Sequence, residues 1–157
     1  MVIDPELAAF LAGPVMTIVG SRDGRNRAEI GRGVGTRVIT AGVVEVVVSG
    51  WQWPATLANL RANGAAAITF ANPADYVCYQ IKGQAALRPA EAADLALSAG
   101  YIAAMTAALA ALGVEQALSA QWLTNRGPVV VRTAVESVFI QTPGPRAGTA
   151  MPAEPPA

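Results

Sequence analysis

Three extended segments joined by very short turns constrain the fold of this chain more than any other feature. Residues 15–21, 27–40 and 43–49 are predicted strands, and the turns between them are residues 22–26 and 41–42. Strands joined by so few residues run antiparallel, because a parallel connection needs a dozen residues or more. The third segment is almost continuous valine, which predicts a strand buried on both faces.

Helices are predicted before, between and after further strands. Asp4 and Pro5 are typical of a helix start, and Gly13 of its end. A second helix is expected from Pro54 to Asn63. The remaining expected elements are strands at 65–71 and 76–87, a long helix at 90–112, a helical piece at 114–123, and final strands at 128–132 and 135–140. Short helices among antiparallel strands predict an α+β fold, a split or closed β-barrel with peripheral helices.

The long predicted helix has no charged residue between Leu95 and Val114. This run is long enough to span a bilayer, but it is mostly alanine, which is nearly neutral in membrane insertion. We therefore expect a buried helix of a soluble protein and no membrane partner. The larger apolar residues are spaced by seven, three, four and three positions, which predicts a narrow seam suited to close packing. The seam consists of Leu95, Ile102, Met105, Leu109 and Leu112.

The chain of 157 residues is long enough for one domain with a substantial core. We expect this domain over residues 1–146 and a disordered tail over 147–157, because the tail is rich in Pro, Gly and Ala. Only 14% of the residues are charged, which indicates that a second copy covers part of the surface, as in a homodimer. The first ten residues carry Asp4 and Glu6 rather than the basic start of a secretory signal, so a cytoplasmic location is expected.

Composition excludes several kinds of chemistry. The formal net charge is zero, which argues against a general nucleic-acid-binding protein. The sequence has no histidine, which removes Ser-His-Asp catalysis, histidine-ligated zinc and a proximal histidine for haem. A single cysteine, Cys78, excludes disulfides and thiolate metal sites within one chain. No metal site and no catalytic residue is recognisable, so an enzyme of this sequence would depend on an organic cofactor.

Arginines cluster in the second predicted strand and the turn before it. Arg32 and Arg37 alternate with Gly31, Gly33 and Gly35, whose missing side chains would let a flat ligand come close. The two arginines are five residues apart, so they face opposite sides of a strand unless a bulge intervenes, and the glycines favour a bulge. We expect a phosphate or carboxylate site at these two arginines, and solvated charges at the turn residues Arg22 and Arg25.

Trp51-Gln52-Trp53 stands directly before the second predicted helix. Two interpretations are equally good: the tryptophans cover a planar ring beside an anion at the helix N-terminus, or they form a hydrophobic plug. The rigid turn at residues 141–145 likewise either closes over a ligand or only terminates the fold.

Several of these motifs, in this order, resemble the pyridoxamine 5′-phosphate oxidase-like proteins, also called FMN-binding split barrels. The resemblance covers about residues 10–146. It rests on the strand-turn-strand with Arg32-Gly-Val-Gly-Thr-Arg37, and on the helix ending Leu60-Arg-Ala-Asn-Gly64. It continues with Phe70-Ala-Asn-Pro-Ala-Asp-Tyr76 leading to Gln80-Ile-Lys-Gly83, and with Val138-Phe-Ile-Gln-Thr-Pro-Gly-Pro145.

The resemblance implies a homodimer with FMN in the groove between the two chains. The strand that it places along the flavin and its phosphate contributes Arg32, Gly33, Val34, Thr36 and Arg37. It also brings to the cofactor the strand end at Ser49, Gly50 and Trp51, the hydroxyl of Thr56, and Gln80 on the fifth strand.

Two departures from the family pattern concern the cofactor. The phosphate-binding Ser-Arg-Lys of the family is replaced by Pro54, Ala55 and Thr56, which removes two positive charges. The glutamine of the family aligns with Cys78, and Gln80 lies two residues further on. FMN is therefore expected to bind weakly, and Thr56→Lys is expected to tighten it.

The resemblance implies an FMN-dependent oxidoreductase acting on a small-molecule substrate that the sequence does not assign. One alternative is a non-catalytic ligand-binding barrel that has lost the cofactor. Another is a barrel that uses deazaflavin or haem in place of FMN. The substitution of Arg32 or Arg37 is expected to weaken cofactor binding more than that of Arg25.

Overall fold

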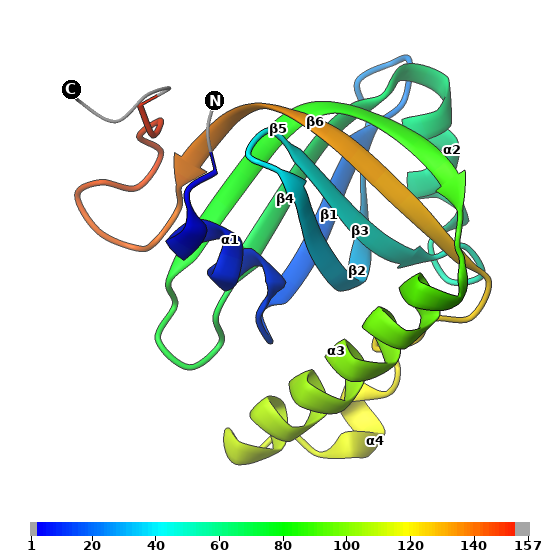
Figure 1. The fold of residues 1–157 in the computed structure, drawn as a ribbon, viewed down its shortest axis with the longest axis vertical. Helices are drawn as coiled ribbons and strands as arrows, with labels where there is room; N and C mark the ends of the chain where they lie inside the picture. Colours follow the sequence, from blue (N-terminus) through cyan, green and yellow to red (C-terminus); the bar gives the residue numbers. More distant parts are fainter. Residues whose placement is uncertain (1–2, 153–157) are drawn as a thin grey trace.

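A computed structural model describes residues 3–152 of the chain (Figure 1). The bounds of its helices are α1 Pro5–Ala12, α2 Pro54–Asn63, α3 Ala92–Ala111 and α4 Gln116–Ser119. The bounds of its strands are β1 Met16–Arg22, β2 Ala28–Thr40, β3 Val43–Ser49, β4 Ala65–Ala71, β5 Cys78–Pro89 and β6 Pro128–Ile140. Most of these bounds agree with the predicted elements to within two residues, and β3 and β4 match them at both ends.

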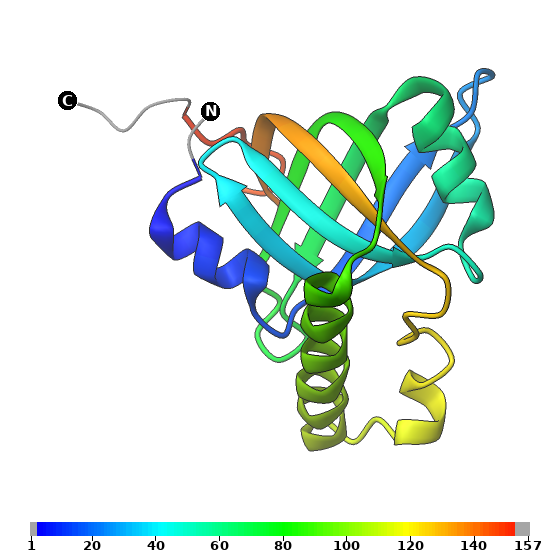
Figure 2. The same cartoon turned by 45° about the vertical axis from the view of Figure 1, so that its right-hand side comes forward.

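The six strands close into one antiparallel barrel in the order β1-β2-β3-β6-β5-β4. This confirms the predicted α+β barrel with peripheral helices. Helices α1 and α2 lie at the barrel, whereas α3 extends away from it and returns through α4 to β6 (Figures 1 and 2).

Two hydrophobic clusters hold these parts together. The barrel interior is filled by side chains such as Phe70, Ile68 and Ile81, and α1 and α2 add leucines to the same cluster. A second cluster lies outside the barrel, where Val47 of β3 packs with Met105 of α3. Because β3 faces one cluster with each side, all but its first residue are buried, as its continuous valines predict.

The local signals for the first two helices act as predicted. The side chain of Asp4 accepts a hydrogen bond from the backbone N–H of Leu7 at 2.7 Å, and Gly13 follows the last residue of α1. Helix α2 ends at Gly64, whose φ of 69° lies in the left-handed region that glycine adopts without strain.

A β-bulge in β2 puts Arg32 and Arg37 on the same side of the sheet. Gly33 pairs with Val48 and Thr36 with Val46, so β2 has one residue more than β3 between these pairs. The extra residue is accommodated at Gly35, where φ is 140°. Beyond the bulge, Arg37 pairs with Glu45, which faces outward between the interior residues Val44 and Val46. The bulge expected from the glycines is confirmed.

Three expectations about the later part of the chain are wrong. The two final strands are one continuous strand, β6, which has one extra residue, Glu136, where its pairing with β5 shifts register between Lys82 and Gly83. The helical piece expected at 114–123 is the single turn α4. The segment 147–152, expected to be disordered, folds back on β6: the N–H of Met151 donates to the carbonyl of Val138 at 2.8 Å. Residues 153–157 of the expected tail lie outside the described part of the chain.

Helix α3 is long and apolar enough to cross a membrane by length and composition, yet it is buried along one stripe only. The buried residues are Asp94, Ser98, Tyr101, Met105 and Leu109. The predicted seam is therefore wrong at both ends, since Leu95 and Leu112 are about half exposed. The buried stripe differs from the predicted seam because the small residues Ser98 and Gly35 let the helix approach β2 on the face that carries Asp94.

Candidate functional site

The outward face of β2 and the loop between α4 and β6 bring several predicted site residues together. Gly33 pairs with Val48 in antiparallel strands, so Arg32, which precedes Gly33, and Ser49, which follows Val48, lie side by side. The guanidinium carbon of Arg32 lies 5.3 Å from the ring centre of Trp122, a cation–π contact. The Oγ atom of Ser49 donates to the carbonyl of Arg126 at 2.7 Å. We call Arg32, Ser49, Gln52, Trp122 and Arg126 the β2–loop cluster.

The segment after β3 forms the other side of this cluster. The N–H of Gly50 donates to the carbonyl of Gly127 at 2.7 Å, and the side-chain amide of Gln52 donates to the carbonyl of Gln121. Trp51 is 58% exposed, and the guanidinium carbon of Arg126 lies 4.4 Å from the centre of its ring. Trp53, in contrast, packs against the barrel core, as the interpretation of a hydrophobic plug requires.

Three polar atoms of the β2–loop cluster are buried without a hydrogen-bond partner in the described structure. They are Nη1 of Arg32, Nε1 of Trp122 and Oε1 of Gln52. Burial lowers the pKa of the Arg32 guanidinium, because no carboxylate offsets its desolvation. Buried polar groups are normally paired, and three of the seven such atoms without partners in the described structure belong to this cluster, which makes it the candidate binding site.

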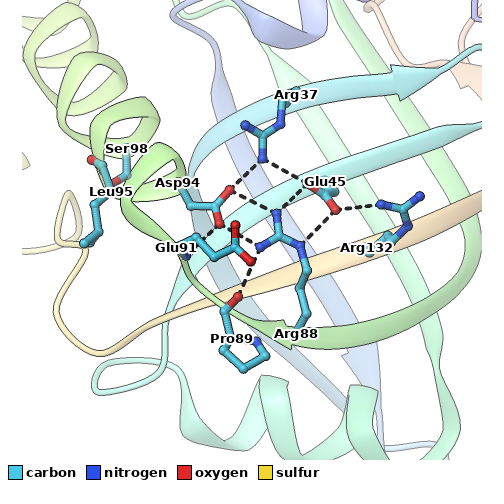
Figure 3. Close-up of polar contacts among 9 residues, drawn as sticks. All are labelled: Arg37, Glu45, Arg88, Pro89, Glu91, Asp94, Leu95, Ser98 and Arg132. Atoms are coloured by element: carbon cyan, nitrogen blue, oxygen red, sulfur yellow. Dashed lines mark hydrogen bonds and ion pairs between the residues drawn. The ribbon is translucent and has the colours of Figure 1, made fainter.

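Arg37, the second arginine of the predicted site, is held by carboxylates of its own chain (Figure 3). Its Nη2 atom donates to Glu45 at 3.0 Å and to Asp94 at 2.6 Å. The same two carboxylates hold Arg88 at 2.7 Å each, and Glu45 also pairs with Arg132 at 2.9 Å. We call these five residues the arginine–carboxylate network; it fastens the start of α3 to β2, β3, β5 and β6.

The network shifts the titration of both of its acids. Hydrogen bonds from Arg88, and then from Arg37, lower the pKa of Glu45 from 4.5 to about 2. Hydrogen bonds from Arg88 also hold the pKa of Asp94 far below its usual range. Hydrogen bonds to Glu45 raise the pKa values of Arg37 and Arg88. Glu45, Asp94, Arg37 and Arg88 are therefore charged at neutral pH.

We expect the network to make the protein lose stability in acid. The pKa of Glu45 is lower in the folded than in the unfolded chain, so its contribution is complete above about pH 4.5 and is lost as the pH falls through about 2. Urea unfolding of wild type and Glu45→Gln between pH 6 and pH 2.5 measures this. The free energy of unfolding should fall more steeply with decreasing pH in wild type than in the variant, and equal slopes would contradict the role given to Glu45.

The remaining residues of the predicted strand and helix are enclosed by the chain itself. Val34 is 1% exposed and packs against α3, and Thr36 is buried opposite Val46. A side chain at Gly33 would meet Val46 at 2.5 Å inside the barrel. The missing side chains of Gly33 and of Gly31, which faces Thr56, therefore serve the packing of the barrel and of α2, rather than the approach of a ligand.

Thr56 does not lie where a phosphate-binding hydroxyl was expected. The residue is completely buried, as are Leu57 and Leu60 on the inner face of α2. The Thr56 side chain lies against β2, where it fills the space that Gly31 leaves. A lysine at this position would place a charge in the core, so Thr56→Lys is not expected to tighten FMN.

Gln80 lies on the outer face of the barrel at a distance from the β2–loop cluster. Strand pairing places Arg32, Ile18, Thr69 and Gln80 in one row across β2, β1, β4 and β5. Arg32 and Gln80 are three strand spacings, about 14 Å, apart along this row. The amide of Gln80 donates to the hydroxyl of Thr69 at 2.9 Å. Within one chain, Gln80 is therefore not part of the cluster.

Two cluster residues were not singled out from the sequence, Trp122 and Arg126. Both belong to the stretch after α4, which was treated as the end of a helix and a connection. Their only signal was a tryptophan and an arginine in a segment of low charge, which does not indicate a position in the fold. The β3–β6 pairing brings this stretch beside Ser49.

Comparison with known proteins identifies the fold. No family model matches the sequence, and no curated protein matches it. A Lactobacillus delbrueckii protein, provisionally described as a pyridoxamine 5′-phosphate oxidase, has a TM-score of 0.55 at 12% identity, over 88% of this chain and 93% of its own. An F420 reductase has a TM-score of 0.56 at 13% identity, over 83% and 93%. The heme storage protein HutZ from Vibrio cholerae has a TM-score of 0.52 at 13% identity, over 89% and 95%. Identities this low show the fold alone.

Proposed function

Since the chain has the split-barrel fold of the pyridoxamine 5′-phosphate oxidase-like proteins, we propose that it is a dimeric flavin-binding protein, an oxidoreductase whose small-molecule substrate is unassigned. The β2–loop cluster is the part of the chain that holds the flavin ring. When bound, a flavin supplies the electron transfer, for which the protein needs no histidine.

The observation that carries this proposal is the set of unpartnered atoms in the cluster. Arg32 Nη1 and Trp122 Nε1 are donors, and Gln52 Oε1 is an acceptor. The pyrimidine edge of a flavin presents carbonyl acceptors on both sides of an N–H donor, so its chemistry complements these three groups. Arg32 would in addition bring positive charge to the ring, which favours the reduced, anionic flavin. The residues present therefore fit the ring of the cofactor.

Deazaflavin is an alternative, because its ring has the same pyrimidine edge and an F420 reductase shares the fold. Haem is a weaker alternative. HutZ, which shares the fold, is a heme storage protein, but this sequence has no histidine and would need another axial ligand. A ligand-binding barrel without catalysis would use the same cluster.

Absorption spectroscopy with each candidate cofactor tests the proposal. The purified protein is incubated with riboflavin, FMN, F420 or haemin and separated from the free compound. Flavin bands near about 370 and 450 nm that elute with the protein would support the proposal. Retention of haemin or F420 and of neither flavin would contradict it.

The face formed by β1, β4 and β5 is suited to contact with the second copy of a homodimer. This face carries a shallow hollow of about 470 Å³ whose floor includes Gly20, Ala65 and Ala67. Ile30 of β2 also lines this hollow and is 59% exposed. Small residues without projecting side chains, next to an exposed isoleucine, favour contact with another protein surface. Gln80 is on the same face, so in a dimer the partner copy would bring its own Gln80 toward the cofactor, as the family pattern implies.

We expect wild type to sediment as a dimer at micromolar concentration and Ile30→Glu to sediment as a monomer. A charge at this position would have to be desolvated at the interface. Leu118→Glu is the matched control, because Leu118 is also about half exposed but lies on α4. A monomeric wild type, or a dimer that resists Ile30→Glu, would contradict the assigned face.

A further inference from the structure

The phosphate end of FMN poses a separate question from its ring. A phosphate monoester carries between one and two negative charges at neutral pH and is held by arginines, lysines or free backbone N–H groups. The inference below rests on the proposed flavin function and concerns which flavin this site selects.

The N-terminus of α2 has no charged side chain and no accessible hydroxyl for a phosphate, and it offers only the backbone N–H groups of Ala55 and Thr56. Pro54 has no backbone N–H, Ala55 has no polar side chain, and the Thr56 side chain is buried against β2. No acidic or basic residue lies in the first turn of α2; its only cation, Arg61, is in the last turn.

Arg37 is already held by carboxylates of its own chain. Its guanidinium pairs with Glu45 and Asp94, whose side chains are 4% and 2% exposed. These carboxylates also hold Arg88, and Glu45 holds Arg132, so three arginines share two carboxylates. A phosphate at Arg37 would lie beside two fixed, buried negative charges, and their repulsion would offset the attraction of the guanidinium.

Arg32 and Arg126 are different, because in residues 3–152 neither takes part in an ion pair. Both, however, lie in the β2–loop cluster, where each guanidinium stacks on a tryptophan ring. The site therefore uses its two arginines without an ion pair at the ring.

We infer that this site selects flavins without a terminal phosphate: riboflavin binds at least as tightly as FMN, and Glu45 and Asp94 determine this specificity by withdrawing Arg37 from the ligand. A protein with this selectivity uses riboflavin itself or a flavin whose side chain ends in an uncharged group.

Fluorescence titration of wild type and Arg37→Gln with riboflavin and with FMN tests the inference. Wild type should bind riboflavin as tightly as FMN or more tightly, and Arg37→Gln should leave the affinity ratio unchanged within about twofold. The variant keeps Arg88 on both carboxylates and Arg132 on Glu45, so its fold is retained. FMN binding at least tenfold tighter than riboflavin in wild type, with the preference lost in Arg37→Gln, would overturn the inference and leave the flavin function standing. Failure of both flavins to bind would overturn the flavin function, and the inference with it.

Asp94→Asn provides a gain-of-function arm. Asparagine still accepts hydrogen bonds but carries no charge, so Arg37 is left with one fixed carboxylate in place of two. The affinity for FMN should rise about tenfold while that for riboflavin stays unchanged, which corresponds to one charge-assisted contact. Circular dichroism of the variant verifies its fold. An equal change in both affinities would overturn the role given to Asp94.

Discussion

Replacing Arg32 by alanine is expected to weaken flavin binding about ten- to hundred-fold, which corresponds to a charge-assisted contact of about 1.5–3 kcal/mol. The reason is the position of the guanidinium: it is half-buried over Trp122, with a donor that no group of the described chain accepts. Removing an uncompensated buried charge should not lower the stability of the free protein. Fluorescence titration with riboflavin gives the affinity, and thermal unfolding of the free protein gives the stability.

Arg25→Ala is the control for this experiment. Arg25 is exposed in the turn between β1 and β2, away from the β2–loop cluster. Its replacement should leave the affinity within about twofold of wild type, since exposed charges of this kind contribute little. Equal losses in the two variants would mean that flavin responds to the net charge of the protein and not to a contact at Arg32.

Replacing Gly83 by alanine is expected to destabilise the fold by about 3 kcal/mol or more. A Cβ atom at this position would lie 1.9 Å from the carbonyl oxygen of Ala134, in the paired backbone of β6. Gly83 stands where β5 shifts register against β6, so the clash cannot be relieved by rotating a side chain. For a domain of this size, such a loss lowers the melting temperature by about 6–12 °C.

Gly100→Ala is the matched control for Gly83→Ala. Nothing lies within 4 Å of a Cβ atom at Gly100, and the residue is exposed in the middle of α3. Alanine should stabilise the helix here by about 0.5–1 kcal/mol, because glycine is the poorer helix former. Thermal unfolding of both variants measures these changes in stability. A Gly83→Ala variant as stable as wild type would contradict the observed pairing of β5 and β6.

The sequence predicts the fold well where the signals are local. Asp4, Pro5 and Gly13 act through neighbouring residues, and Gly64 ends α2 by its own backbone conformation. The valines of β3 are correctly assigned to a strand buried on both sides, because a continuous apolar run has few other solutions. The prediction for β6 was wrong at Thr133 and Ala134, which were left between two strands although β6 runs through them.

The candidate site was less predictable, because it depends on pairing between distant residues. The glycines of β2 were correctly linked to a bulge, but whether their open faces meet a ligand or the barrel core depends on Thr17, Val46 and Thr56. The ion pair that occupies Arg37 depends on Asp94, which lies 57 residues away and reaches β2 only after α3 docks. Trp122 and Arg126 join the site through the pairing of β3 with β6, which no local pattern specifies.

A crystal structure of the protein grown with excess riboflavin tests the central claim most directly. The claim predicts a ring in the β2–loop cluster, with an acceptor atom about 3 Å from Nη1 of Arg32. It also predicts a second copy across the face formed by β1, β4 and β5. A ring bound elsewhere, with Arg32, Gln52 and Trp122 unchanged, would contradict the assignment of the site.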